Sequence, residues 1–174
     1  SWFYEQNDLG FNYRLTDISA ALGLSQLKQL KQFIKKRHEI AERYFKELQI
    51  ENIKLPFQCD EGKSSFHLFI IRATALTGPM SHKSLFERLR KSGINVNLHY
   101  IPIYRHPFYK NIGFDESNFP MAESYYSQAI SIPIFPSMTF DQQTKVINTI
   151  KEINLEQEVD EVSDNSEKGF QDLF

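Results

Sequence analysis

The sequence predicts an α/β protein of the α+β kind, in which a long helix precedes a small mixed domain. Apolar residues spaced three and four apart run from residue 16 to residue 48, which is the period of an amphipathic helix. A dense apolar run at residues 66–73 contains the β-branched residues typical of a strand. A helical segment at residues 81–92 and an alternating segment at residues 94–100 follow. The order strand, helix, strand with short connections indicates one compact layer of sheet and helix.

Composition excludes several classes of protein. Of the 174 residues, 41% are hydrophobic and 14% are aromatic, which favours a folded chain with its own core. The formal net charge is −2, so no whole-chain basic field suggests nucleic acid. The single Cys59 excludes an internal disulfide framework. No apolar run approaches the length of a membrane span and no signal-peptide pattern is present, so we expect a cytoplasmic protein with no membrane partner.

The predicted long helix, residues 16–48, is the largest element. Thr16 has the side chain of an N-cap, and Asp17 places negative charge in the first turn, where the helix dipole favours it. As one helix, the segment would be about 50 Å long. Because one small domain cannot bury that length, we expect the helix to bridge two lobes or to pack on a partner subunit.

Residues 49–153 are predicted to form the small domain. A connector lies before the strand at residues 66–73, Gly93 is placed as a helix C-cap, and Pro120 suits the first turn of a helix over residues 119–129. Residues 130–137 form an apolar, extended stretch. Thr139 is placed to cap a final helix that reaches residue 153.

Residues 154–174 differ in composition from the rest of the chain. Seven acidic residues are opposed by Lys168 alone. Such a segment has few apolar residues with which to offset the entropy of ordering. We therefore expect a mostly disordered acidic tail.

The loop before the long helix, residues 1–15, contains the run Phe11 to Arg14, which places an amide, a phenol and a guanidinium just ahead of a helix start. Asn12 and Arg14 donate hydrogen bonds, and a helix N-terminus adds partial positive charge, so the run suits an anionic phosphate. The simpler alternative on residue chemistry is a local structure in which Asn12 makes a turn and Arg14 pairs with Asp17.

Aromatic and basic side chains gather around residues 99–114. His99, Tyr100 and Tyr109 belong to this group, and Pro102, Pro107 and Gly113 make the segment a shaped loop. Such a group can stack on a ring and donate hydrogen bonds to sugar hydroxyls or to a diphosphate. The alternative is a well-packed aromatic corner without a ligand.

Two other chemistries receive no support. The histidines have no Cys or carboxylate partner at a spacing typical of zinc, so we predict no metal site. No G-x-S-x-G elbow is present, which argues against a serine hydrolase.

The run GFNYRLTDISAALGLSQLKQL closely resembles the sugar aminotransferases of the DegT/DnrJ/EryC1/StrS family, which use pyridoxal 5'-phosphate (PLP). It is most similar to the PseC-like transaminases of that family, which aminate a UDP-linked 4-keto-6-deoxy hexosamine. WFYEQNDL, SSFHLFIIR, GINVNLHYIPIYRHPFY and FPMAESYYSQAISIPIFP match as well, so that the resemblance covers about residues 2–153. It implies the C-terminal part of a fold-type I PLP-dependent transferase that works as a homodimer.

The resemblance also implies roles for single residues. Asn12 would reach the PLP phosphate of the other subunit, and Arg14 would support it. His99, Tyr100 and Tyr109 would line the site of the nucleotide-sugar substrate. No catalytic residue is nominated, because the family's Schiff-base lysine and the acidic partner of the cofactor ring lie upstream of the NYR motif.

We therefore expect a C-terminal fragment of an enzyme that moves an amino group, from glutamate, to a UDP-linked 4-keto-6-deoxy amino sugar. The family uses this reaction in surface-glycan or nonulosonic acid biosynthesis. The fragment alone is expected to be inactive, because it lacks the Schiff-base lysine. The alternative is a non-catalytic, helix-rich module for dimerisation or docking.

Overall fold

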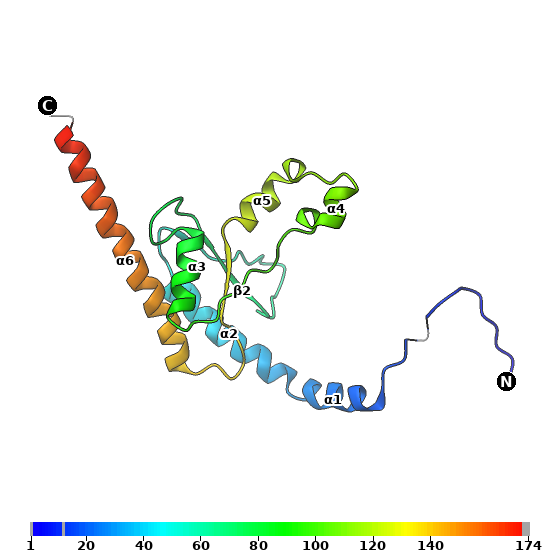
Figure 1. Cartoon of the computed structure of the whole chain (residues 1–174). Coiled ribbons are helices and arrows are strands. Elements are labelled where there is room, and N and C mark those ends of the chain that lie inside the picture. Colours follow the sequence, from blue (N-terminus) through cyan, green and yellow to red (C-terminus); the bar gives the residue numbers. More distant parts are fainter. Residues whose placement is uncertain (1, 12, 172–174) are drawn as a thin grey trace.

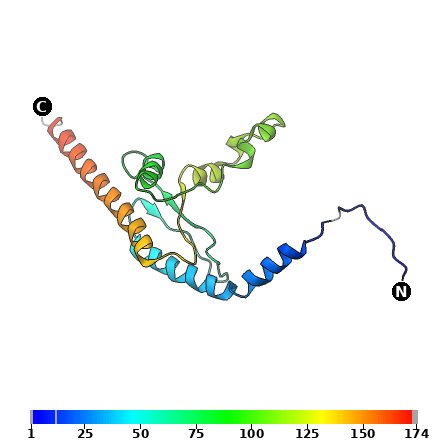
Figure 2. The ribbon, with the colours of Figure 1, turned by 60° about the horizontal axis from the view of Figure 1, so that its bottom comes forward.

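The computed structural model of the chain describes residues 2–11 and 13–171, and describes side chains as far as residue 159. A body of helices and sheet carries two projections, an N-terminal arm with the first helix and the far end of the last helix (Figures 1 and 2). The elements in chain order are α1 (Asp17–Leu27), α2 (Leu30–Glu47), β1 (Ile53–Lys54), β2 (Phe69–Ala73), α3 (His82–Lys91), η1 (Ile103–Arg105), α4 (Pro107–Asn111), η2 (Glu116–Asn118), α5 (Pro120–Tyr126), β3 (Ala129–Ile132) and α6 (Phe140–Gln171).

The three strands form one antiparallel sheet in the order β1-β2-β3. Side chains alternate along β2, so that Phe69, Ile71 and Ala73 are buried while Ile70 and Arg72 are half-buried on the other face. The buried face packs against α2, α3 and α6, and these elements share one hydrophobic core (including Tyr44, Leu48, Leu85, Leu89, Ile130, Ile147 and Ile150). We call the second face, which no helix of this core covers, the open face.

The local signals for helix ends are confirmed. The Thr16 hydroxyl accepts a hydrogen bond from the Ser19 N–H at 3.2 Å, as an N-cap does. Gly93 has a φ of +74° after α3, and the Ile94 N–H bonds back to the Leu89 carbonyl at 3.0 Å. This is the Schellman arrangement, in which a glycine tolerates the left-handed conformation that ends the helix.

The predicted helix over residues 16–48 is divided at Lys28 and Gln29 into α1 and α2. The Gln29 N–H bonds to the carbonyl of Gln26, three residues back, which interrupts the α-helical ladder. The physical reason is unequal packing. The α2 helix buries Ile40, Ala41 and Tyr44 in the core, whereas α1 has no buried residue to hold it in line.

The predicted strand at residues 94–100 pairs with the sheet at one position only, where Asn97 bridges Ser131 of β3. Neighbouring backbone donors are used locally. The Val96 N–H bonds to the Ile94 carbonyl at 3.0 Å, and the Leu98 N–H bonds to the Asn97 side chain at 2.8 Å. A longer ladder is therefore prevented, although the predicted alternation holds, with Ile94 and Val96 buried.

The acidic segment after residue 153 also differs from the expectation of disorder, because α6 continues as a helix through Gln171. Tertiary contacts hold its first part. The buried Gln157 side chain accepts a hydrogen bond from the Met80 N–H at 3.1 Å, and Glu156 forms an ion pair with Arg88. Composition gives no sign of these long-range contacts.

Residues 101–128 form an excursion between the Asn97 bridge and β3. Pro120 begins α5 as predicted, but the helix ends at Tyr126 and the chain then enters β3. The rings of Tyr104 and Phe119 stack with centroids 4.3 Å apart, and the Arg105 guanidinium binds both carboxylate oxygens of Glu123. This ion pair lowers the pKa of Glu123 and raises that of Arg105.

Replacing Tyr44 with Phe tests the tie between α2 and the segment after β3. The buried Tyr44 hydroxyl donates to the Pro133 carbonyl at 2.8 Å, so its loss is expected to cost about 1 kcal/mol in the free energy of unfolding at pH 7. Burial raises the pKa of this phenol, so its stabilising effect is complete below the unfolded pKa and is lost as pH rises toward the folded value. Urea titrations of both proteins at pH 7 and above pH 10 measure this. If the free energy of unfolding fell by the same amount above pH 10 in the unaltered protein and in Tyr44→Phe, the alkaline effect would not come from Tyr44.

Candidate functional site

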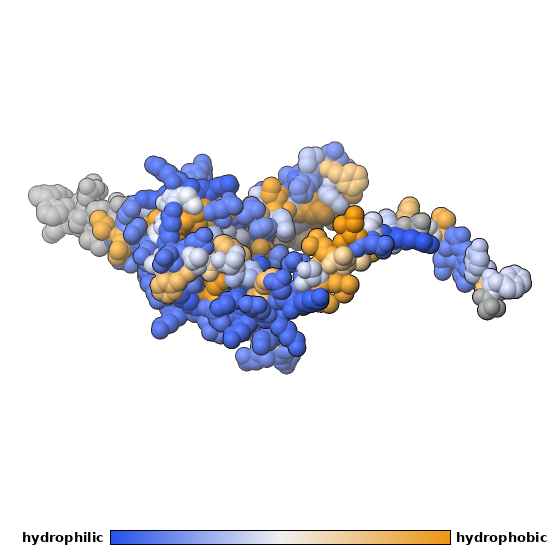
Figure 3. Space-filling view, turned by 90° about the horizontal axis from the view of Figure 1, so that it is seen from below, coloured by the Kyte–Doolittle hydropathy of each residue, from blue (hydrophilic) through white to orange (hydrophobic). Residues whose placement is uncertain are grey.

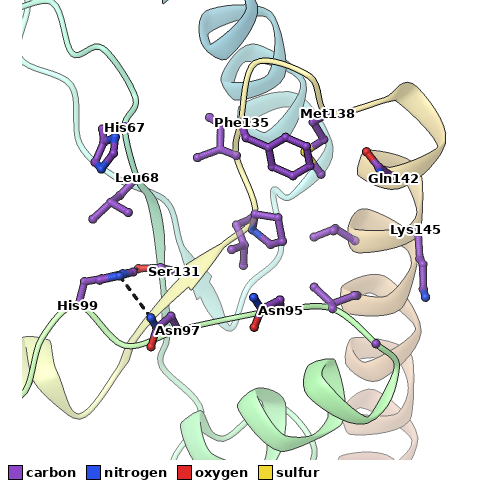
Figure 4. A pocket seen from close by; sticks show the side chains of 16 residues that line it. His67, Leu68, Asn95, Asn97, His99, Ser131, Phe135, Met138, Gln142 and Lys145 are labelled. Carbon is purple, nitrogen blue, oxygen red and sulfur yellow. Dashed lines mark hydrogen bonds between the residues drawn. The ribbon is translucent and has the colours of Figure 1, made fainter. Parts of the chain in front are cut away.

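A cavity lies between residues 93–99, β3 and α6 (Figure 4). Its volume is about 610 Å³, which lies within the range of small-ligand sites. Apolar groups from β3, the following loop and α6 form much of its wall, and polar groups gather at the rim (His67, Asn95, Asn97, His99, Ser131, Gln142 and Lys145). The cavity combines an apolar wall with a few polar groups, as sites for organic ligands do.

Two neighbours fix the His99 ring. Its Nδ1 lies 2.8 Å from the Ser131 hydroxyl oxygen, and its Nε2 lies 3.4 Å from the Asn97 amide nitrogen (Figure 4). Ser131 is only 6% exposed. Its backbone pairs with Ile70 of β2 on one side and with Asn97 on the other. The sheet therefore determines the position of His99.

The same contacts determine which nitrogen of His99 carries a proton. Because the Asn97 side-chain oxygen accepts from the Leu98 N–H, the amide nitrogen, a donor, faces the ring. Nε2 then accepts, so that Nδ1 carries the proton and donates to the Ser131 hydroxyl. In this arrangement Nε2, beside the Asn97 amide, is the acceptor nitrogen of the ring.

The other two predicted substrate residues lie differently. Tyr100 is 75% exposed and meets His99 edge-on, with ring centroids 4.8 Å apart. Tyr109 lies in the excursion, in edge contact with Phe108 and Phe114. Neither tyrosine lines the cavity, so the structure brings His99 and Tyr100 together and leaves Tyr109 apart.

Of the predicted phosphate-binding pair, Asn12 lies outside the described residues. Arg14 is exposed at the end of the N-terminal arm, two residues before the Thr16 cap. The arm leaves the body of the molecule along the direction of α1 (Figures 1 and 2). The N-terminal arm, to which Arg14 belongs, therefore projects away from the sheet and its helices.

The α1 helix exposes apolar side chains of the kind that usually pack against another surface. It has no buried residue, and large apolar side chains on it are exposed (Ile18, Leu22, Leu24 and Leu27). Figure 3 shows apolar atoms gathered over this part of the molecule. An apolar patch of this kind marks an interaction surface.

Sequence reasoning missed Ser131 and the orienting part that Asn97 plays. Ser131 belongs to the apolar, extended stretch predicted at residues 130–137. The signal that was present is its isolation, because Ser131 is the polar residue between Ile130 and Ile132, both buried. A buried hydroxyl needs a partner, and His99 provides it.

Other chemistries find little support in the described part of the chain. No group of three or more His, Cys, Asp or Glu side chains that could hold a metal ion occurs among the described residues. Lys145 is the lysine that lines the cavity, and it is exposed to solvent. No helix among the described residues is both long and apolar enough to cross a membrane.

The chain belongs to the DegT/DnrJ/EryC1/StrS aminotransferase family, whose model matches residues 2–151. The spore coat polysaccharide biosynthesis protein SpsC of Bacillus subtilis is 35% identical over 156 residues, covering 88% of this chain and 40% of SpsC. The UDP-4-amino-4,6-dideoxy-N-acetyl-beta-L-altrosamine transaminase of Campylobacter jejuni (serotype O:2) is 36% identical over 156 residues, covering 86% of this chain and 39% of that enzyme. The chain thus spans about 40% of these relatives' length.

Solved structures agree with the fold. The sugar aminotransferase Spr1654 of Streptococcus pneumoniae in its PLP form matches with a TM-score of 0.78 and 30% identity, covering 88% of this chain and 39% of that one. PseC of Helicobacter pylori, an aminotransferase of pseudoaminic acid biosynthesis, matches with a TM-score of 0.76 and 28% identity, covering 88% and 41%. The chain therefore has the fold of part of a fold-type I PLP-dependent aminotransferase, and PLP is the cofactor of this family.

The start of α1 has groups that fit the phosphate of PLP. The Arg14 guanidinium is exposed there. Among the described residues, no acceptor is assigned to the N–H groups of Asp17 and Ile18, in the first turn. Backbone donors and a guanidinium at a helix N-terminus are suited to an anion.

Substituting Ser131 tests how His99 is held. In Ser131→Ala the partner of Nδ1 is lost, so we expect the proton of His99 to redistribute between Nδ1 and Nε2. Nitrogen chemical shifts of the ring report the two forms directly. Thr144→Ala, which alters a hydroxyl on α6, is the control and should leave the His99 shifts unchanged. Unchanged shifts in Ser131→Ala would contradict the assignment.

Proposed function

We propose that this chain is part of a PLP-dependent sugar-nucleotide aminotransferase. In the complete enzyme an amino group would pass from glutamate to a UDP-linked 4-keto-6-deoxy amino sugar, in surface-glycan or nonulosonic acid biosynthesis. The observation that carries the proposal is the family match over residues 2–151, together with the similarity to a UDP-amino-sugar transaminase.

PLP supplies an electron sink and a carrier for the amino group when it is bound. This chain would contribute to holding it. Asn12 and Arg14 would donate hydrogen bonds to the cofactor phosphate of the neighbouring subunit in a homodimer. The arm projects away from the sheet and its helices (Figure 1), which supports action in trans.

His99 would orient the sugar substrate. Its Nε2 accepts hydrogen bonds in the tautomer that Ser131 and Asn97 select, so a sugar hydroxyl can replace the long 3.4 Å contact with Asn97. Tyr100, exposed beside His99, would offer a ring face to the sugar or base. Tyr109 would act only at the outer edge of the site, because it does not line the cavity.

The exposed apolar side chains of α1 support an assembly with a second subunit and with the rest of the enzyme. By itself the 174-residue chain is proposed to be inactive. Its cavity lysine, Lys145, is exposed and so lacks the apolar surroundings that make a lysine a good nucleophile. After incubation with PLP and borohydride, mass spectrometry of the chain should find no stoichiometric adduct on a single lysine.

A chimera tests the proposal. Residues 2–151 would replace the matching part of Helicobacter pylori PseC, leaving the remainder of that enzyme in place. We expect a dimer that binds PLP and aminates a UDP-linked 4-keto sugar. Arg14→Ala should lower the affinity for PLP by about tenfold or more, since a charged hydrogen bond is lost.

Lys46→Ala, at the end of α2, is the matched control and should leave PLP binding unchanged. A chimera that folds and dimerises but does not retain PLP would favour the alternative, a non-catalytic dimerisation or docking module. A soluble, dimeric chimera that binds PLP and fails to transfer the amino group would contradict the proposed reaction.

A further inference from the structure

Two cations lie directly opposite each other on the open face of the sheet. Lys54 of β1 pairs in register with Arg72 of β2. Their neighbours in the same strands, Ile53 and Ala73, are buried on the helix-covered side, so the two cations point to the open face. Like charges at opposed positions of an antiparallel pair are destabilising.

Nothing in the described part of the chain neutralises this pair. No ion pair or side-chain hydrogen bond involves Lys54 or Arg72 among the described residues. Arg72 is half-buried in the sheet, and Lys54 is exposed at its edge. Arg88, Arg105 and Lys151, by contrast, each meet a carboxylate.

Both cations line a cavity of about 350 Å³. Its remaining wall is apolar or aromatic (Leu55, Pro56, Phe57, Leu68, Ile70 and Tyr125). Burial raises the pKa of the Tyr125 phenol, and the charge of Arg72 opposes that effect, which agrees with a guanidinium close to the ring. The cavity therefore offers positive charge beside flat, apolar surfaces.

The cavity adjoins the His99 site. Leu68 lines both cavities. Ile70, two residues before Arg72 on the same face, pairs with Ser131, the partner of His99. The two cavities therefore lie on either side of Leu68.

We propose that Lys54 and Arg72 form a binding site for the phosphate group of a ligand that also carries a planar heterocycle. A dianionic phosphate neutralises both cations, whereas a single carboxylate leaves one charge uncompensated. The guanidinium offers a bidentate fork, and Phe57 and Tyr125 offer stacking surfaces. Only the identity of the physiological ligand, a nucleotide sugar, rests on the proposed function.

Calorimetric titration of the 174-residue chain with UDP, pyrophosphate and uridine tests the site. We expect UDP to bind, pyrophosphate to bind more weakly, and uridine to bind at least about tenfold more weakly than UDP, because charged hydrogen bonds provide most of the affinity. Arg72→Gln and Lys54→Gln should each weaken UDP binding by about tenfold, whereas Lys91→Gln, which removes an equal charge from α3, should change it less than about twofold.

A stability measurement separates a ligand site from a structural role. Since the two cations repel each other, Arg72→Gln should raise the melting temperature of the unliganded chain while it weakens UDP binding. A lowered melting temperature with unchanged UDP affinity would overturn the proposal and indicate that Arg72 is structural. Absence of UDP binding would also overturn it, and would point to a carboxylate from another segment as the partner.

The phosphate site and the proposed reaction can be contradicted independently of each other. If the PseC chimera transfers amino groups but Arg72→Gln leaves the KM for the nucleotide sugar unchanged, the phosphate site is wrong and the proposed function stands. If Arg72-dependent UDP binding is found but the chimera transfers no amino group, the phosphate site stands and the reaction is wrong.

Discussion

The antiparallel pairing of β2 with β3 is the constraint on which the rest of the molecule depends. Its register places Phe69 opposite Ile132 and Ile71 opposite Ile130, so that these apolar side chains meet α2, α3 and α6. Because the period of a strand is two, the same register places Ile70 and Ser131 on the opposite face. A slip of one residue in β2 would turn the Arg72 guanidinium toward the core and expose Phe69 and Ile71.

The same register determines which side chains lie on the open face. At the β3 end, Ser131 and Asn97 orient His99 at a cavity of about 610 Å³, and at the β1 end Lys54 and Arg72 gather positive charge. The core helices pack on the other face, while α5 adds Tyr125 and α6 adds Lys145 to the cavity walls, so one sheet supplies both a packed core and a surface for a ligand. Arg37 fixes the adjoining loops, since its guanidinium donates to the carbonyls of Phe66, His67 and Ile134 at 2.9 to 3.0 Å. The site therefore rests on backbone that the core holds in place.

Features determined by local chemistry could be predicted from the sequence. Thr16 and Gly93 cap helices as expected, because caps depend on neighbouring residues. The break at Lys28 and the helix beyond residue 153 could not be predicted, since each depends on packing with distant segments. In the site, the resemblance pointed to His99. The isolated polar position of Ser131 is visible in the sequence, but its contact with His99 depends on strand register and could not be predicted.

The central claim is that the open face of the sheet is the side turned toward cofactor and substrate, while α2, α3 and α6 form the outer layer. A crystal structure of residues 2–151 joined to a complete cofactor-binding lobe, with PLP bound, measures this most directly. The account predicts that His99 and Ser131 lie on the cofactor side of the sheet, with α1 covered by a second subunit. A structure in which those helices separate the sheet from the cofactor would contradict it.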